Sequence, residues 1–255
     1  MKKIKEKRHF TDSELLNPSN PVAVILIGAG GTGSQVLTAL ARMSHSLQAL
    51  GHAGLQVSLW DDDVITEANR GRQLFAACEV GLYKATALIA RCNRFFGTDW
   101  KAVLKKFDTR TASTKAAIFI SCVDTVTARF EIAKVLQDAD APRYWMDFGN
   151  GRNTGQVVLS TVGCLPQPNS KLFKTIGSLP FVTEEYGELL HHSEIDRDAP
   201  SCSLAEALEK QDLFINATLA QFGGALLWQL FRNGYTTHRG CFVNLEHFRV
   251  QNLPL

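Results

Sequence analysis

Short apolar runs alternate with amphipathic segments through the first half of the chain. The runs lie at Val22–Ile27, Leu55–Trp60 and 116–123, and each has the length of a buried strand. Apolar residues recur at helical spacing in Ser34–Met43, in the segment that Lys84 opens, and in Thr125–Leu136. This alternation predicts an α/β fold in which a parallel sheet carries helices on both faces.

The second half predicts antiparallel strands and one buried helix. Strands are expected at Tyr144–Asp147, Thr154–Ser160, Gly240–Leu245 and Phe248–Gln251, with a turn at 149–151. The segment Leu213–Phe231 is apolar on nearly every side, so we expect a buried helix that ends at Gly234. Residues 168–200 are largely polar and have a proline at each end, which predicts a long crossover loop.

A glycine-rich turn joins the first strand to the first helix, with the sequence Gly28-Ala29-Gly30-Gly31-Thr32-Gly33. In such a turn the first glycine reverses the chain, the second lets backbone amides approach a phosphate, and the last lets helix and strand pack closely. The unpaired amides at the helix start favour an anion. The context predicts a Rossmann-like nucleotide site; the alternative is a tight turn with no ligand.

Acidic and then cationic residues follow the second strand. Asp61-Asp62-Asp63 begins where that strand ends, the position at which a carboxylate binds ribose hydroxyls; a solvated turn is the alternative. The polar residues Asn69, Arg72, Gln73 and Lys84 come next. Cations beside a phosphate-binding turn can neutralise a triphosphate or its transition state, whereas a dinucleotide needs fewer of them. Lys84 alone is also compatible with an ordinary basic helix face.

Asp124 ends the strand predicted at 116–123. A carboxylate at the carboxyl end of a parallel strand points to the ligand-binding edge of the sheet. Mg²⁺ is commonly held by one or two carboxylates together with phosphate oxygens, so Asp124 is the candidate magnesium ligand. It can also cap the following helix, and the two roles are compatible.

These motifs resemble the ThiF/MoeB/HesA-type enzymes, which are relatives of ubiquitin-activating enzymes, from about Val22 to Phe231. The resemblance rests on the glycine turn, Asp61-x-Asp63, Asn69-x-x-Arg72-Gln73, Val80-Gly81-x-x-Lys84 and Cys122-Val123-Asp124-x-x-x-x-Arg129. It implies an ATP-dependent adenylyltransferase that acts on the C-terminal carboxylate of a ubiquitin-like or sulfur-carrier protein, and it implies a homodimer.

The resemblance also implies residue roles. Asp61 would bind ribose, the triphosphate would be held by Asn69, Arg72 and Lys84, and Asp124 would place magnesium. The family usually has asparagine where this chain has Thr125. Such dimers often supply an arginine from the N-terminal arm across the interface, and Arg8 is a candidate although its spacing to the turn matches poorly.

A narrower resemblance is to the ThiF-family member of PRTRC cassettes. It rests on the chain length of 255 residues and on Pro200-Ser201-Cys202-Ser203. It implies a ubiquitin-like protein, a conjugating-enzyme-like protein and a JAB-type peptidase as partners.

Cys202 precedes a predicted helix whose capping box is Ser203-Leu204-Ala205-Glu206. A helix N-terminus lowers a thiol pKa, so Cys202 suits attack on an acyl-adenylate to form a thioester. The alternative is a buried structural cysteine. Cys122, Cys164 and Cys241 fall within strand patterns and are expected in the core. The chain has no CxxC pair, so we expect no zinc site and reduced thiols in a cytoplasm.

Composition bounds the function. The formal net charge of +2 argues against nucleic acid as the main partner, and no apolar run approaches a membrane span. The basic start 1–7 lacks the apolar core of a signal peptide and is expected to be a solvated arm. We expect one adenylation domain over 1–255, with an arm (1–20), a nucleotide-binding half (21–136) and a carrier-binding half (137–255) that contains a crossover at about 168–202.

Two other functions are compatible with parts of the sequence. An NAD(P)-dependent oxidoreductase would explain the glycine turn and Asp61, but not Arg72, Lys84 and Asp124 together. A non-catalytic adaptor would keep the fold and bind a carrier without activating it, and the presence of the phosphate-binding residues argues against it. The last two strands could bind the carrier's extended tail by strand addition.

Overall fold

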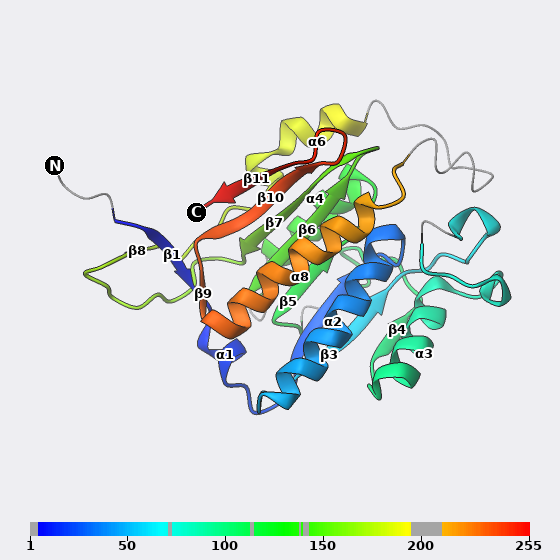
Figure 1. Cartoon of the computed structure of the whole chain (residues 1–255), viewed down its shortest axis with the longest axis horizontal. Coiled ribbons are helices and arrows are strands. Elements are labelled where there is room, and N and C mark those ends of the chain that lie inside the picture. The colour runs from blue at the N-terminus through cyan, green and yellow to red at the C-terminus, as the bar shows by residue number, and fades with distance from the viewer. Residues whose placement is uncertain (1–4, 71–72, 113–114, 138, 140–142, 195–210) are drawn as a thin grey trace.

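A computed structural model describes residues 5–70, 73–112, 115–137, 139, 143–194 and 211–255 of the protein. Its main sheet has eight strands in the order β11-β10-β7-β6-β5-β2-β3-β4 (Figure 1). Parallel pairing joins β4, β3, β2, β5 and β6. Antiparallel pairing joins β6, β7, β10 and β11. The predicted Rossmann-like sheet with an antiparallel C-terminal part is therefore confirmed.

The strands of this sheet are β2 (Val22–Ile27), β3 (Leu55–Trp60), β4 (Lys101–Val103), β5 (Ile118–Ser121), β6 (Tyr144–Asn150), β7 (Thr154–Thr161), β10 (His238–Asn244) and β11 (Arg249–Pro254). The helices are α1 (Ser13–Leu16), α2 (Gly31–Ala49), α3 (Lys84–Phe96), α4 (Val126–Gln137), α5 (Val182–Glu185), α6 (Gly187–Glu194) and α8 (Ile215–Asn233), with short 3₁₀ helices at Glu67–Asn69 and Ala77–Glu79. Helix α2 is longer than the predicted Ser34–Met43, because it begins within the glycine turn itself.

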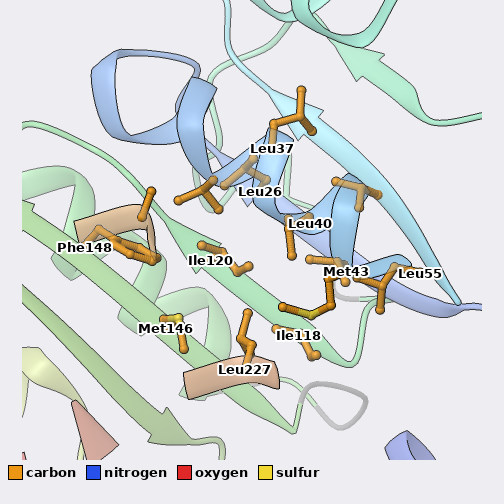
Figure 2. Close-up of a cluster of buried hydrophobic side chains, with 14 of the residues drawn as sticks. Leu26, Leu37, Leu40, Met43, Leu55, Ile118, Ile120, Met146, Phe148 and Leu227 are labelled. Atoms are coloured by element: carbon orange, nitrogen blue, oxygen red, sulfur yellow. The ribbon is translucent and has the colours of Figure 1, made fainter. Parts of the chain in front are cut away.

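Alternate side chains of the parallel strands supply two cores on the two faces of the sheet. Leu26 belongs to the core under α2, α3 and α8, which Figure 2 shows with Leu40 and Leu227 among its members. The neighbouring Ile27 belongs to the second core, under α4, α5 and α6. Because successive residues of a strand point to opposite faces, an apolar run such as that of β2 is buried on both sides.

The strand register brings several strand ends to one edge of the sheet. Ile27 lies opposite Trp60 and Ser121, and Ser121 lies opposite Asp147. The segments that follow β2, β3 and β5 therefore leave the sheet side by side. Ligands bind at this carboxyl edge in open parallel sheets, so the fold gathers the glycine turn, Asp61 and Asp124 where a ligand site is expected.

The start of the arm was expected to be solvated, and its described residues 5–7 are exposed, with a strand beginning at Lys7. Strand β1 (Lys7–Phe10) pairs with β8 (Lys174–Thr175) and β9 (Tyr235–Thr236) in a small three-stranded sheet. The predicted crossover contains order as well, since β8, α5 and α6 all lie within it. Side-chain contacts explain this order: buried Phe181 and Leu190 pack into the second core. In the part of the chain that the structure describes, no helix is long and apolar enough to cross a membrane.

The buried C-terminal helix is confirmed. Helix α8 ends at Gly234, whose φ of 69° is left-handed, the backbone conformation in which glycine commonly ends a helix. Phe248 lies in the turn before β11 and does not begin that strand, because its own φ of 49° is positive and a strand requires an extended backbone.

Candidate functional site

The glycine turn is shaped by close backbone contacts at its two ends. A Cβ atom on Gly28 would lie 2.6 Å from the carbonyl oxygen of Cys122, and one on Gly33 would lie 1.9 Å from the carbonyl oxygen of Gly28. Gly28 also has a φ of 95°. These two positions require glycine for packing alone, whatever the site binds.

The middle of the turn faces open space. A Cβ atom on Gly30 would meet no atom within 4 Å. Gly30 is the N-cap residue of α2, and among the described residues no side chain caps this helix. Since the first amides of a helix have no intrahelical partner and carry partial positive charge, this end of α2 can receive an anion. Packing does not explain Gly30, whereas close approach of a ligand does.

Asp61 holds the turn from the end of β3. One carboxylate oxygen accepts a hydrogen bond from the amide of Ala29 at 2.6 Å, and the other accepts one from the amide of Asp63 at 3.0 Å. Burial raises the pKa of this carboxyl, although the Ala29 hydrogen bond and the charge of Lys84 act in the opposite direction. A carboxylate has about four acceptor sites, so these two bonds leave capacity for ribose hydroxyls.

Lys84 is a buried cation at the start of α3. Its Nζ donates to Asp63 Oδ2 at 2.7 Å, and its backbone amide donates to the carbonyl of the same residue at 2.9 Å. Only 7% of the lysine is exposed, whereas the side chain of Asp63 is 65% exposed. Lysine is rarely buried to this degree unless it is paired, so the protein maintains a positive charge here through one exposed partner.

Asn69 and Gln73 lie in the sequence between Asp63 and Lys84. The side-chain oxygen of Asn69 accepts from the amide of Thr66 at 2.9 Å and so caps the 3₁₀ turn Glu67–Asn69. Gln73 is 6% exposed, and its buried Oε1 makes no hydrogen bond with any residue that the structure describes. A buried acceptor without a partner is costly. Arg72, which the sequence assigns to the triphosphate, lies outside the described residues.

Asp124 is exposed in the segment between β5 and α4. Thr125 is exposed beside it, and its hydroxyl accepts from the amide of Ala128 at 3.2 Å. The Thr125 hydroxyl therefore caps the first turn of α4. A buried arginine, Arg129, lies beneath this segment.

The cysteines differ from their predicted places in part. Cys241 is buried in β10 as expected, and Cys122 is half-buried in the segment after β5. Burial and the charge of Asp147 raise the pKa of the Cys122 thiol well above its ordinary value. The expectation of a core position is wrong for Cys164, which is exposed, because β7 ends at Thr161 and the chain has turned out of the sheet. Cys202 and its capping box lie outside the described residues.

Sequence reasoning missed Asn216, which packs against the glycine turn from α8. Its side-chain oxygen accepts from the hydroxyl of Thr32 at 2.8 Å and from the amide of Asn150 at 2.6 Å, and its nitrogen donates to Gln211 at 3.0 Å. A Cβ atom on Gly31 would come within 2.6 Å of this side chain. The detectable signal was an asparagine near the start of a mostly apolar helix.

The residues at this edge fit ATP with magnesium in their chemistry. An open, uncapped helix start suits phosphate, Asp61 suits ribose, and Lys84 is a buried cation beside them. Within the described residues, no cluster of three or more His, Cys, Asp or Glu side chains could hold a metal ion. One exposed carboxylate, Asp124, is nevertheless the donor type that Mg²⁺ uses when phosphates supply other ligands.

The fold and this edge together define a Rossmann-like α/β protein with a candidate nucleotide site. Residues 10–237 match the model of the ThiF family. The chain therefore belongs to the ThiF family.

Solved structures share the fold. E. coli MccB with MccA has a TM-score of 0.61 and 14% identity, over 94% of this chain and 65% of the MccB chain. E. coli MccB with ATP has a TM-score of 0.60 and 14% identity over the same shares. PaaA has a TM-score of 0.59 and 15% identity, over 94% of this chain and 74% of its own. The chain thus spans slightly less than two thirds of MccB. No curated protein sequence matches it significantly.

Proposed function

We propose that this protein is an ATP- and Mg²⁺-dependent adenylyltransferase that activates the C-terminal carboxylate of a small ubiquitin-like or sulfur-carrier protein. The observation that carries the proposal is the pairing of an uncapped helix start at Gly30 with the buried, singly paired Lys84 at one sheet edge. Membership of the ThiF family and the shared fold of MccB, which was solved with ATP, support it.

In the proposed reaction, a carboxylate oxygen of the carrier attacks the α-phosphorus of ATP. The bond from the α-phosphorus to the bridging oxygen breaks, so pyrophosphate leaves and an acyl-adenylate forms. Asp61 would hold the ribose, and the amides of Gly30 and Gly31 would orient the phosphates. Asn69, Arg72, Gln73 and Lys84 would line the triphosphate, where the cations stabilise the charge that develops on the leaving group.

Asp124 would hold Mg²⁺, and the ion would neutralise phosphate charge when it is bound. When the nucleotide binds, the ion pair between Lys84 and the exposed Asp63 would break, and the lysine would pair with a phosphate instead. Because Lys84 is buried and its current partner is exposed, this exchange needs movement of the aspartate alone.

Several finer features belong to the same proposal. The carrier would bind the C-terminal half, and its extended tail would lie along β11, the last strand of the sheet order. Cys202 would accept the acyl group as a thioester. The assembly would be a cytoplasmic homodimer, and conjugating-enzyme-like and JAB-type peptidase partners would act downstream, as in a PRTRC cassette. Arg8 is already engaged within its own chain, because its guanidinium lies over Phe173 and Tyr235 and pairs with Glu6.

The test is ATP–pyrophosphate exchange in the presence of purified ubiquitin-like and sulfur-carrier proteins. We expect exchange that depends on carrier and Mg²⁺, that is lost in Asp124→Ala and Arg72→Ala, and that persists in Cys202→Ala because the thioester step follows adenylation. Exchange that fails with every carrier, combined with thermal stabilisation by NAD and none by ATP with Mg²⁺, would contradict the proposal and favour the oxidoreductase.

A further inference from the structure

Arg129 is buried directly beneath the segment that carries Asp124. Both Arg129 and Asp147 are 1% exposed, and the Nε of the arginine donates to the two carboxylate oxygens at 3.2 and 3.1 Å. The carboxylate is fixed in turn by Ser121, whose hydroxyl donates to Asp147 Oδ1 at 2.5 Å and accepts from the indole nitrogen of Trp145 at 2.8 Å.

The other nitrogens of Arg129 point to backbone carbonyls. One donates to the carbonyls of Val123 and Phe148 at 2.8 and 3.0 Å, and the other donates, at a longer 3.4 Å, to the carbonyl of Thr125. Val123 and Thr125 are the two neighbours of Asp124. The guanidinium therefore holds the backbone on both sides of the candidate magnesium ligand.

This arrangement needs an arginine. A guanidinium offers five N–H donors in a rigid plane, and here they serve one carboxylate and three carbonyls that lie in different directions. A lysine has three donors on a flexible stem and cannot span this set. A Cβ atom on Gly149 would lie 3.2 Å from the guanidinium, so the neighbouring strand leaves little room for an alternative placement.

A requirement of stability alone does not explain the ion pair. Replacement of a buried ion pair by apolar side chains of similar size is often neutral or stabilising, and Trp145, whose indole joins this network, belongs to the apolar second core. The ion pair has one geometric consequence: with the carbonyl contacts of Arg129, it fixes the backbone of residues 123–125.

We propose that Arg129 and Asp147 are positioning residues that hold Asp124 in place for the magnesium-bound triphosphate. The inference rests on the proposed function, since it gives Asp124 its role there. Neither residue touches the nucleotide. The ion pair sets the direction in which the Asp124 carboxylate leaves the loop, so its effect on binding passes through that carboxylate.

The test is a double-mutant cycle on ATP binding, measured by calorimetry with Mg²⁺ and again with EDTA. The proteins are wild type, Arg129→Lys, Asp124→Asn and the double variant, and the exposed Arg94→Lys is the matched control. We expect Arg129→Lys to weaken binding of Mg²⁺–ATP about 10-fold, as for an outer-shell partner of a metal ligand, with little change in binding of metal-free ATP. In the Asp124→Asn background, Arg129→Lys should have no further effect, because coupled residues are not additive.

A second readout does not depend on ATP. Hydrogen–deuterium exchange of the peptide that spans 122–128 should be faster in Arg129→Lys than in wild type and unchanged in Arg94→Lys. If Arg129→Lys fails to fold, Ser121→Ala removes the hydrogen bonds to Asp147 and from Trp145 but leaves the guanidinium–carboxylate contact, and it should shift both readouts in the same direction by a smaller amount.

Three outcomes would overturn the inference. The first is that Arg129→Lys weakens ATP binding equally with and without Mg²⁺. The second is that its effect and that of Asp124→Asn are additive in the double variant. The third is that hydrogen–deuterium exchange at 122–128 is unchanged in the folded Arg129→Lys protein. Failure of adenylation is a separate result: if Mg²⁺–ATP binding follows the predicted cycle while no carrier supports pyrophosphate exchange, the positioning role stands and the proposed function falls.

Discussion

Lys84 shows at the scale of a single residue how the site combines burial with charge. Its ammonium group is almost fully removed from solvent, and its hydrogen-bonded partner Asp63 is exposed, while the charge of Lys84 also acts on the carboxyl of Asp61. A phosphate can compete for such a lysine more easily than for one held by a buried acid. Sequence spacing located the lysine, but only the structure shows its burial and partner.

We predict that Lys84→Met lowers pyrophosphate exchange by about 10²- to 10³-fold, the usual effect of removing one charge-stabilising group from a site. Methionine retains the apolar stem, so the melting temperature should change little. Lys134→Met, on an exposed face of α4, is the control and should leave exchange at the wild-type level. Exchange in Lys84→Met within a few-fold of wild type would mean that the lysine serves the fold alone.

The glycine turn is the element in which packing and ligand binding can be separated. A Cβ atom on Gly33 would lie 1.9 Å from the carbonyl oxygen of Gly28 in the same turn, whereas one on Gly30 would meet no described atom within 4 Å. The motif predicts a packing role for the last glycine and a phosphate role for the second. The contacts of the structure agree with that division.

We predict that Gly33→Ala is strongly destabilised and that Gly30→Ala folds with nearly wild-type stability but binds ATP at least about 10-fold more weakly. The reason is that an added methyl at position 30 enters the space through which phosphate would approach the backbone. Thermal melts and calorimetric ATP titrations check the two halves. A stable Gly30→Ala protein with unchanged ATP affinity would place the phosphates elsewhere.

Strand β1 is anchored to the main body by a buried histidine. His9 lies between the carbonyl of Ile176 at 2.7 Å and the hydroxyl of Tyr144 at 2.9 Å. A carbonyl only accepts, so Nδ1 carries the hydrogen and Nε2 accepts from the tyrosine. Burial lowers the pKa of His9, although the Ile176 carbonyl and Asp12 act against that shift.

We predict that stability falls as the pH drops below about 6.5, the ordinary histidine pKa. Between the ordinary pKa and the lowered pKa of the folded state, the unfolded chain binds a proton at His9 that the folded chain does not bind. The free energy of unfolding therefore decreases as the pH falls through this range, and it levels off below the folded-state pKa. Denaturant melts from pH 7.5 down to 5 should show this slope. His9→Gln should lessen it, and the exposed His45→Gln should not; equal slopes in all three proteins would contradict the assignment.

The fold of the whole molecule was largely predictable from the sequence. The run Val22–Ile27 and the helix Leu213–Phe231 are governed by hydrophobic periodicity, which is local, and both appear close to their predicted bounds. Cys164 was predicted wrongly because the apolar pattern does not show that β7 ends at Thr161. The small sheet was not predicted because β1 pairs with segments more than 150 positions away. Asn216 and Asp147 were missed for the same reason, since their partners come from other elements.

The structure assembles the candidate site from nearly the whole length of the chain. Four parts of the site reach one sheet edge only when the strands are in register. They are the turn after β2, Asp61 after β3, Asp124 after β5 and Asn216 on α8. A site built in this way can couple nucleotide binding to the C-terminal half, where the carrier is proposed to bind.

Transfer of label from ATP to the carrier tests the central claim most directly. The carrier is incubated with the Cys202→Ala enzyme, which cannot pass the acyl group to that thiol, together with Mg²⁺ and ATP labelled at either the α- or the γ-phosphate, and the reaction is stopped in acid. Adenylation predicts that the α-label, and not the γ-label, appears on the carrier and is lost when its C-terminal carboxylate is blocked as an amide. Transfer of the γ-label, or no transfer of either label by an enzyme that binds ATP, would contradict the account.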